Sequence, residues 1–276
     1  MVKILEVENL SKRYGVGCAN CFSSTGPAYA SNVCRHCGSV VAANNLSFEL
    51  YQGEILGIIG ESGSGKSNAV KNLFFDEVPT SGRAYYWQDE IRYSLFELNR
   101  AQHRRLANES FAMVYQNPYL GLNFEISAGA NIAERLLMAG QSSYAEIRAR
   151  AQQLLNRTEV SSERMDELPK NFSGGMQQRV QIAKALATNP PLLFLDEVTT
   201  GLDLSVQAAI LDLILDIQQE SKSSMIVVTH DLGVIRLLAT RTLVMQHGQV
   251  VESGLTDQIL EDPQQAYTQR LVASAL

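Results

Sequence analysis

The sequence has no apolar run that approaches the roughly 20 residues a membrane-spanning helix needs. Its N-terminus does not match a secretory signal peptide either, because acidic residues interrupt it from Glu6 onward. We therefore expect a cytoplasmic protein that is not embedded in a membrane. Basic residues are not in excess: the formal net charge is −6, and we interpret the cluster at Arg100–Arg105 as a solvated helix face. This charge balance gives no reason to expect a nucleic-acid partner.

Cysteines are few, and the sequence contains neither an internal repeat nor a low-complexity segment. Four cysteines in a cytoplasmic protein point to metal or redox chemistry more than to disulfides. A hydrophobic share of 45% supports a well-buried core, and 19% charged residues argue against disorder. The length of 276 residues suits one large domain, or a core that carries a subdomain.

The glycine-rich stretch Gly60–Ser67 lies between an apolar run at Glu54–Ile59 and a helical pattern at Asn68–Phe75. Strand, glycine loop and helix form the context of a phosphate-binding loop, where backbone N–H groups turn inward at a helix N-terminus. Lys66 would reach the β- and γ-phosphates of a nucleoside triphosphate, and the Ser67 hydroxyl would ligate Mg²⁺. The predicted nucleotide-binding residues here are Gly60, Glu61, Ser62, Gly63, Ser64, Gly65, Lys66, Ser67 and Asn68.

All four cysteines occur in one short segment as two CxxC pairs, Cys18 with Cys21 and Cys34 with Cys37. Twelve residues, 22–33, separate the pairs, which is typical of a tetrahedral site with four sulfur ligands. We predict a structural metal site over residues 18–37, because protein ligands would fill every position. Zn²⁺ is the expected metal, and an iron centre is the alternative because thiolates suit both.

Alternating and helical patterns divide the chain into strand-rich parts and a helical insert. Strands are predicted at residues 4–10, 41–50, 82–87, 111–115, 192–195 and 225–229, with a hairpin around His247-Gly248. Helices are predicted at residues 97–107, 177–187, 204–219 and, as the C-terminal helix, 263–276. Between residues 117 and about 170 only helical patterns occur, and one of them places Ile147, Ala151, Leu154 and Leu155 on a single stripe. We therefore predict a helical subdomain over residues 117–176.

Two adjacent carboxylates, Asp196 and Glu197, follow the apolar strand Leu192–Leu195. In parallel α/β sheets, ligands bind at the edge where such strands end. Asp196 can hold Mg²⁺ through water, and Glu197 can accept a proton from an attacking water. By itself such a pair is a weak signal, but together with the phosphate-binding loop it predicts the second half of an ATPase site.

Three further features each allow a simpler explanation. Ser173, before two glycines at a helix start, predicts a second anion site, but serine also caps ordinary helices. Gln116, at a strand end, could contact Mg²⁺ or water, but is as well explained as a surface residue. His230, after a buried strand, could reach a γ-phosphate, although a lone histidine is often structural.

The order of these motifs along nearly the whole chain resembles that of the ATP-binding cassette ATPases. The matches are Walker A at Gly60–Ser67, the Q-loop at Gln116, the signature at Ser173–Gln177, Walker B at Leu192–Glu197, the D-loop at Gly201–Asp203 and the switch histidine at His230. The resemblance implies one domain over residues 1–276, with an α/β P-loop NTPase (RecA-like) core, an antiparallel β subdomain and a helical subdomain insert. It also implies a head-to-tail dimer, of the chain with itself or with a paralogous ATPase, that clamps two ATP molecules between Walker A and the partner's signature.

The resemblance also implies roles for single residues. Glu197 would polarise the attacking water, His230 would hold the γ-phosphate, and Asp203 would communicate across the dimer interface. Tyr14 lies where the family stacks an aromatic ring on adenine. The signature residues implied to contact the partner's nucleotide are Ser173, Gly174, Gly175 and Gln177.

Two positions depart from the family pattern. Val198 stands where a proline normally follows the Walker B glutamate, which puts the rigidity of that turn in doubt. Asn68 replaces the usual Thr or Ser after the Mg²⁺-binding serine, a change we expect to be mild because that side chain lies beyond the metal.

Stretches outside the core motifs bear on the partner. Residues 127–136, 231–234, 248–257 and 263–268 resemble the cassette ATPase subunit of the bacterial carbon–phosphorus lyase system for phosphonate breakdown. The implied partner is a soluble lyase core that ATP turnover remodels. The apolar alternation of Leu120, Leu122, Phe124 and Ile126 suggests an exposed edge for this partner, although internal packing explains it about as well.

The alternative is the ATP-binding subunit of a dipeptide or oligopeptide importer, which would meet permease subunits at the membrane. Such subunits share the Pro-x-x-x-Tyr-Thr tail but usually continue into a cysteine-bearing extension. The sequence ends at Leu276 with no cysteine after Cys37, so we expect the lyase partner. A role in translation or DNA repair fits less well, because those members carry two cassettes or longer inserts.

Overall fold

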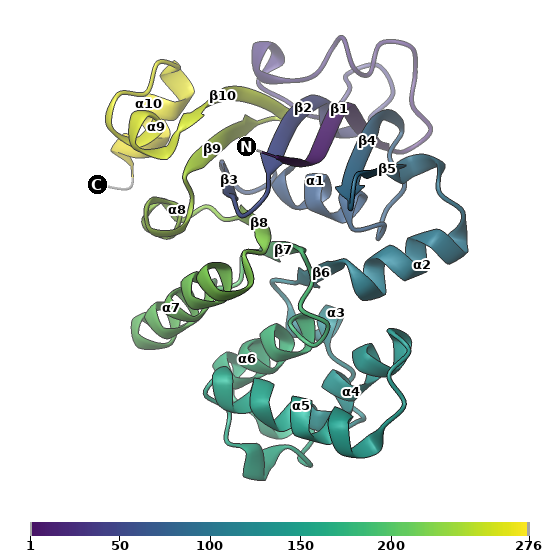
Figure 1. Cartoon of the computed structure of the whole chain (residues 1–276). Coiled ribbons are helices and arrows are strands. Elements are labelled where there is room, and N and C mark those ends of the chain that lie inside the picture. Colours follow the sequence, from purple (N-terminus) through teal and green to yellow (C-terminus); the bar gives the residue numbers. More distant parts are fainter. Residues whose placement is uncertain (1, 275–276) are drawn as a thin grey trace. The chain divides into compact units, whose positions relative to one another are not determined.

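The computed structural model describes residues 2–274, which form two compact units (Figure 1). The glycine-loop unit contains Met1–Arg100 and Ser224–Leu276, and the helical unit contains Ala101–Ser223. Helices and strands occur in both. Within residues 2–274, no helix combines the length and the apolar character that crossing a bilayer requires.

The glycine-loop unit contains an antiparallel sheet in the order β2-β1-β4-β5. Its strands are β1 (Lys3–Tyr14), β2 (Val40–Tyr51), β4 (Ser81–Gln88) and β5 (Ile91–Ser94). Leu46, Phe48 and Leu50 of β2 are buried, whereas Ser47 between them and Asn45 before them are exposed. The strands predicted at residues 4–10 and 41–50 are confirmed and are longer than expected. The short edge strand β5 was not predicted.

A second set of strands in this unit follows the order β10-β9-β3-β8. β3 (Ile55–Ile59) and β8 (Ser224–Val228) are buried throughout and pair in parallel, with Ile58 opposite Val228. β9 (Arg241–Gln246) runs parallel to β3 and forms a hairpin with β10 (Gln249–Leu255). His247 and Gly248 at its tip both have positive φ, 47° and 81°, which a tight two-residue hairpin turn requires.

Four helices complete this unit: α1 (Lys66–Leu73), α8 (Leu232–Leu238), α9 (Thr256–Glu261) and α10 (Ala266–Ala273). Of these, α8 and α9 were not predicted. The C-terminal helix is shorter than the predicted 263–276. The N–H groups of Gln264 and Gln265 bond to the carboxylate of Glu252 instead of entering a helical turn. Residues 275–276 lie outside the described part of the chain.

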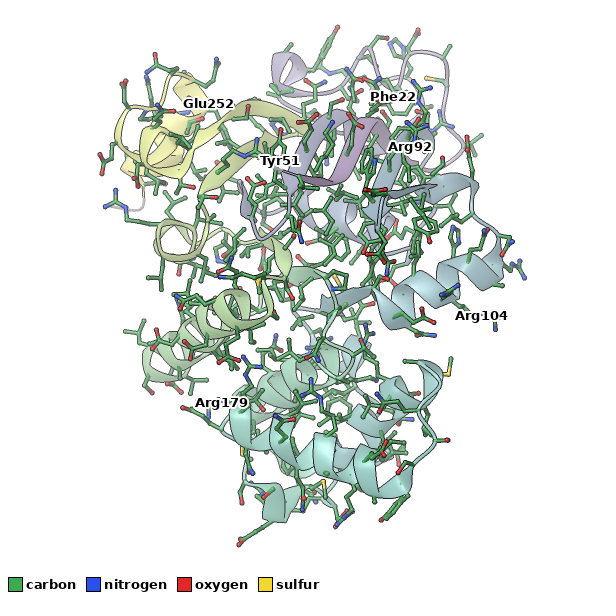
Figure 2. The ribbon with its side chains drawn as sticks, in the orientation of Figure 1. Phe22, Tyr51, Arg92, Arg104, Arg179 and Glu252 are labelled. Carbon is green, nitrogen blue, oxygen red and sulfur yellow. The ribbon has the colours of Figure 1, made fainter. Side chains whose placement is uncertain are left out.

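The cysteine segment lies between β1 and β2 and packs against the unit. Cys21, Cys34 and Val41 form a buried cluster against which Cys18 and Phe22 pack. The Asn44 amide donates to the Phe22 carbonyl at 2.9 Å (Figure 2 labels Phe22). The segment is therefore a folded part of the unit.

The helical unit holds one parallel strand pair and most of the helices. The strands are β6 (Phe111–Val114) and β7 (Leu192–Asp196), whose Phe111 and Phe194 rings meet edge to face. The helices are α2 (Arg100–Glu109), α3 (Pro118–Gly121), α4 (Ala128–Met138), α5 (Tyr144–Arg157), α6 (Gly174–Ala185) and α7 (Leu204–Ser221). All four residues of the predicted apolar stripe of α5 are buried, because α5 packs against α4 and α6.

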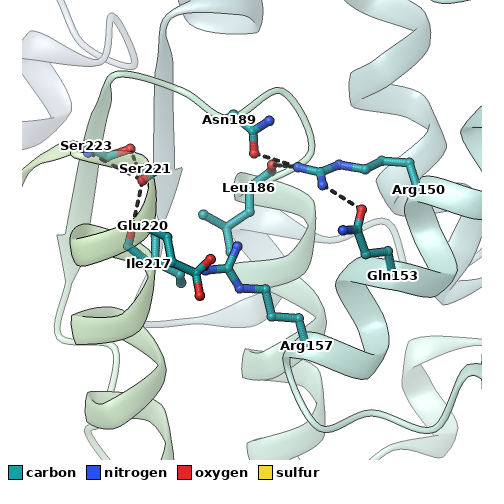
Figure 3. Close-up of polar contacts among 9 residues, drawn as sticks. All are labelled: Arg150, Gln153, Arg157, Leu186, Asn189, Ile217, Glu220, Ser221 and Ser223. Atoms are coloured by element: carbon teal, nitrogen blue, oxygen red, sulfur yellow. Dashed lines mark hydrogen bonds and ion pairs between the residues drawn. The ribbon is translucent and has the colours of Figure 1, made fainter.

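Two arginines of α5 contact the C-terminal ends of α6 and α7 (Figure 3). The Arg150 guanidinium donates to the Leu186 carbonyl and to the side chain of Asn189, and Arg157 pairs with Glu220 of α7. Residues 117–170 contain no strand, as predicted, although 3₁₀ turns at Ser162–Arg164 and Pro169–Asn171 interrupt the helices.

The predicted exposed edge after Gln116 is wrong in part, because internal packing, the alternative explanation, accounts for Leu122. Leu120 is 63% exposed in the short helix α3, but Leu122 is only 6% exposed because the chain turns inward after that helix. The helix predicted to begin at residue 97 begins at Arg100, after a 3₁₀ turn at Leu95–Glu97. Its Arg100–Arg105 face is largely exposed, as expected (Figure 2 labels Arg104).

Candidate functional site

The glycine loop connects the end of β3 to the first turn of α1. Lys66 is only 4% exposed, and its ammonium donates to the Gly60 and Glu61 carbonyls at 2.7 and 2.9 Å. A Cβ at Gly60 would lie 2.2 Å from the Met245 carbonyl oxygen, and one at Gly65 2.0 Å from the Ala42 carbonyl oxygen. Only glycine therefore fits these two positions.

The loop has the properties of an anion site. The hydroxyl of Ser64 is buried and finds no hydrogen-bond partner within residues 2–274, which leaves a polar group for a ligand to satisfy. The N–H groups at the start of α1 also point toward the loop, where the helix dipole favours negative charge. These residues fit the phosphates of a nucleotide.

Tyr14 lies near the start of α1 through Asn68. Its hydroxyl lies within hydrogen-bonding distance of the Asn68 amide oxygen and the Glu77 carboxylate, which share its one proton, and the Lys12 ammonium lies 4.8 Å from the centre of its ring. Burial, together with the bond to Glu77, raises the pKa of Tyr14. The substitution at Asn68 thus has a local role, since it connects Tyr14 to α1, which the sequence alone did not indicate.

His230 lies two residues after the end of β8 and is exposed. The Thr229 hydroxyl accepts the Asp231 N–H at 3.0 Å, and Asp231 caps α8 by accepting the N–H groups of Gly233 and Val234. Because β3 and β8 are parallel neighbours, His230 and the glycine loop leave the same edge of this unit.

Asp196, Glu197 and Gln116 gather at one edge of the helical unit. Asp196 ends β7 and is 4% exposed, and Gln116 follows β6, whose Val114 lies opposite Leu195. The Gln116 amide donates to a Glu197 carboxylate oxygen at 2.9 Å. The sequence placed each residue at a strand end, and the structure brings the two side chains into contact.

Glu197 has a strained backbone, with φ of 49° in a region that non-glycine residues seldom adopt. Its carboxylate also accepts the Thr200 hydroxyl at 3.2 Å, and its carbonyl accepts the Thr200 N–H at 3.1 Å. Val198 is buried beneath this turn, 4% exposed. Packing and hydrogen bonds therefore hold the turn where a proline was expected.

The signature residues begin α6. Ser173 is its N-cap and accepts the Met176 N–H, while the Gln177 amide donates to the Pro169 and Phe172 carbonyls. A Cβ at Gly174 would meet no atom of the described chain within 4 Å, whereas one at Gly175 would approach Val206. Gln177 thus stabilises the preceding turn, and nucleotide contact by this motif stays a prediction.

Two residues that sequence reasoning missed connect α6 to the Q-loop. The buried side chains of Gln178 and Gln181 both donate to the Tyr115 carbonyl, and Gln181 also accepts the Tyr115 N–H at 2.6 Å. Gln178 and Gln181 therefore hold the backbone of Tyr115, the residue directly before Gln116. The sequence signal that could have identified them is the presence of two polar residues on the buried side of α6.

Asp203 caps α7. Its carboxylate accepts the Ser205 hydroxyl at 2.6 Å and the Val206 N–H at 3.0 Å, and these two bonds lower the pKa of Asp203. The geometry gives Asp203 a local structural role in addition to the predicted role at a dimer interface.

The four cysteine sulfurs lie within 4.8 Å of one another. The Sγ atom of Cys18 lies 3.7 Å from the Sγ atoms of Cys21 and Cys34, and the Sγ atoms of Cys21 and Cys37 lie 3.4 Å apart. A tetrahedral zinc site with bonds of about 2.3 Å has sulfur–sulfur edges of about 3.8 Å. Within this cluster, a hydrogen bond with Ser24 helps to lower the pKa of Cys34 to about 6, whereas burial and hydrogen bonds with the other thiols raise the pKa of Cys18. The residues therefore fit a tetrahedral metal ion.

The predicted catalytic, nucleotide-binding and Mg²⁺-binding residues are divided between the units. Tyr14, Lys66, Ser67 and His230 belong to the glycine-loop unit, and Gln116, Asp196 and Glu197 belong to the helical unit. Ser67, Gln116 and Asp196, the predicted Mg²⁺ contacts, include residues of both, and their joint role stays a prediction.

Comparison with known proteins gives close relatives. The model of the ABC transporter family matches residues 43–200. The phosphonates utilization ATP-binding protein PhnK of Escherichia coli (strain K12) is 51% identical over 233 residues, 84% of this chain and 91% of the relative. The oligopeptide transport ATP-binding protein OppD of Bacillus subtilis (strain 168) is 39% identical over 242 residues, 86% of this chain and 67% of the relative.

Solved structures agree in fold. The dimeric structure of a post-hydrolysis state of the ATP-binding cassette MJ0796, bound to ADP and Pi, has a TM-score of 0.77 at 27% identity, covering 92% of this chain and 99% of that one. The structure of cbiO1 from Clostridium perfringens has a TM-score of 0.74 at 26% identity, with 95% and 92% covered.

Proposed function

The chain belongs to the ABC transporter family of ATP-hydrolysing cassettes, and from this premise we propose that it drives a conformational change in a soluble carbon–phosphorus lyase core complex during phosphonate catabolism. The observation that carries the proposal is the 51% identity to PhnK, against 39% to OppD over a similar length. The proposed location is the cytoplasm.

In the proposed reaction, the phosphates of ATP lie on the glycine loop. The N–H groups at the start of α1 and the Ser64 hydroxyl bind phosphate oxygens, and the Lys66 ammonium moves from the loop carbonyls to the β- and γ-phosphates. Tyr14 stacks on adenine. Mg²⁺, when bound, neutralises phosphate charge; Ser67, Gln116 and Asp196 would hold it.

Glu197 is the proposed general base. Its carboxylate is held by Gln116 and by Thr200, so that one oxygen can be aimed at an attacking water. His230 donates a hydrogen bond to the γ-phosphate.

A dimer completes the proposed site. The MJ0796 cassette forms dimers, which supports a head-to-tail pair here, either of this chain with itself or with a paralogous ATPase. Ser173 and Gly175 would then contact the nucleotide bound to the partner, and Asp203 would lie near the interface. Gln178 and Gln181 would couple this motif to the Q-loop, since both hold Tyr115.

The cysteine segment is proposed to hold one structural Zn²⁺, and an iron centre is the alternative. With four sulfur ligands the ion would leave no position open for a substrate. The segment also contacts the glycine loop directly, because the Asn32 amide donates to the Gly63 carbonyl at 3.3 Å. The zinc site would therefore stabilise the nucleotide site.

The proposed partner surface lies just after the Q-loop and consists of Tyr119, Leu120 and Phe124. Tyr119 and Leu120 are 66% and 63% exposed, and the Tyr119 ring stacks on Phe124 with centroids 4.0 Å apart. The fully buried side chain of Asn131 accepts the Asn123 N–H and donates to the Asn123 carbonyl. These two bonds hold the segment in place. A preformed, exposed apolar patch of this kind suits a protein partner.

Replacing Leu120 with Asp tests the surface and the partner together. Leu120 is preferable to the half-buried Phe124 because most of its side chain is exposed, so that an aspartate there should disturb little packing. We expect Leu120→Asp to retain ATP binding and to lose co-purification of lyase-system proteins from the phosphonate-grown host. The matched control is Leu237→Asp, an exposed leucine of α8, which should retain both.

Identification of the bound proteins by mass spectrometry decides between the two candidates. Recovery of phosphonate-processing enzymes with the wild type and Leu237→Asp, but not with Leu120→Asp, supports the proposal. Recovery of a multi-span permease with a peptide receptor, and of no phosphonate-processing enzyme, would replace it with the importer function suggested by the likeness to OppD.

A further inference from the structure

The C-terminal helix reaches the glycine loop through one side chain. The Tyr267 hydroxyl, from the first turn of α10, accepts the Glu61 N–H at 3.0 Å, although the two residues are 206 positions apart. Tyr267 is 7% exposed, and its neighbour Thr268 is fully buried. Tyr267 belongs to the Pro-x-x-x-Tyr-Thr tail, which the sequence did not connect with the nucleotide site.

The peptide that Tyr267 holds also carries the Lys66 contact. The Glu61 N–H and the Gly60 carbonyl belong to the same peptide group, and that carbonyl accepts the Lys66 ammonium at 2.7 Å. The next carbonyl, of Glu61, accepts both Lys66 and the Ser64 N–H. Because a peptide group is planar, fixing its N–H also fixes the direction of its carbonyl.

Glu252 of β10 holds the helix that carries Tyr267 (Figure 2 labels Glu252). Its two carboxylate oxygens accept the N–H groups of Gln264 at 2.7 Å and Gln265 at 3.1 Å, directly before α10 begins. A carboxylate that accepts two backbone N–H groups forms charge-assisted bonds, which are stronger than neutral ones. The start of α10 is therefore anchored on one side by Glu252 and on the other by the glycine loop.

We propose that Tyr267 is a positioning residue for ATP binding, and that Glu252 acts through it. Tyr267 orients the Gly60–Glu61 peptide, so that the loop holds Lys66 and Ser64 ready for the phosphates. The C-terminal helix thus contributes to the nucleotide site by orienting the glycine loop. This role is independent of the identity of the partner, since it concerns ATP binding alone.

The variant Tyr267→Phe removes the hydroxyl and keeps the ring. We expect the Kd for ATP, measured by calorimetric titration of the full chain, to rise about three- to tenfold, the effect of one lost hydrogen bond. The matched control is Tyr144→Phe, which removes a hydroxyl from a tyrosine that is 75% exposed on α5 and should leave the Kd unchanged. Without nucleotide, Tyr267→Phe should melt only a few degrees below the wild type, because the Glu61 N–H loses its partner, and Tyr144→Phe should melt like the wild type.

The variant Glu252→Gln, alone and with Tyr267→Phe, tests the connection between the two residues. If Glu252 acts through Tyr267, the double variant binds ATP about as weakly as Tyr267→Phe alone, because coupled sites are not additive. An unchanged Kd in Tyr267→Phe would overturn the positioning role. Fully additive effects in the double variant would overturn the connection to Glu252. A loss of ATP affinity that only accompanies a large fall in melting temperature would show that Tyr267 is structural.

Discussion

Replacing Cys34 with serine should remove the metal from the cysteine segment and weaken ATP binding as a consequence. Cys34 is 1% exposed, belongs to the buried cluster with Cys21 and Val41, and lies two residues after Asn32. Around it, the Cys34 N–H bonds to the Ser39 carbonyl at 2.9 Å. Loss of the ion would therefore loosen the segment from which Asn32 contacts the glycine loop.

The expected magnitudes follow from these contacts. Changes to residues that only support metal ligands reduce metal affinity about 10–100-fold, so loss of a ligand should cost at least about 100-fold. The bond from Asn32 to the Gly63 carbonyl is neutral and long, at 3.3 Å, and should contribute about 0.5–1 kcal/mol. ATP affinity should therefore fall about two- to fivefold.

The assay compares three proteins purified in reducing buffer without added metal. Elemental analysis should find one Zn²⁺ per chain in the wild type and in Asn32→Ala, and little in Cys34→Ser. Titration should find weaker ATP binding in both variants. Asn32→Ala is the matched control, since it removes the contact to the loop and leaves all four thiols in place.

Two results would refute this reasoning. If freshly prepared wild type contains neither zinc nor iron, the cysteine segment is not a metal site. Cys34→Ser that loses its metal but binds ATP with unchanged Kd would show that the segment is not coupled to the glycine loop, whatever ion it holds.

Two further changes test the helical unit. Glu197→Gln should retain ATP binding but lower hydrolysis by about 10²-fold or more, the scale of a missing general base, and accumulate an ATP-bound dimer on size-exclusion chromatography; near-normal turnover would exclude Glu197 from that role. Asp203→Ala should lower the melting temperature near neutral pH by removing the cap of α7. Because the folded-state pKa of Asp203 is lowered, its stabilisation is present above the ordinary carboxyl pKa and is lost as pH falls below about 4, so the difference from wild type should shrink there; an undiminished difference would contradict the assignment.

The local motifs could be predicted from the sequence because their chemistry depends on neighbours in the chain. Gly60–Ser67 forms its loop from adjacent N–H groups, and each CxxC pair places two sulfurs by its own turn. Asp196 was placed at a strand end because apolar runs of this length form buried strands in a parallel arrangement. The same reasoning identified the apolar stripe of α5, where one helical period determines which side chains are buried.

Contacts between distant segments could not be predicted in this way. The pairing of Tyr267 with Glu61, of Asn32 with Gly63 and of Gln181 with Tyr115 leaves no pattern in the neighbouring sequence, because each partner also suits an ordinary surface or core position. The same holds for Leu122, whose burial depends on where the chain turns after α3. The sequence alone thus determined which groups can bind phosphate and metal, since that chemistry is local. Only the tertiary structure decided which side chains hold those groups in place, because folding brings together residues that the chain order separates.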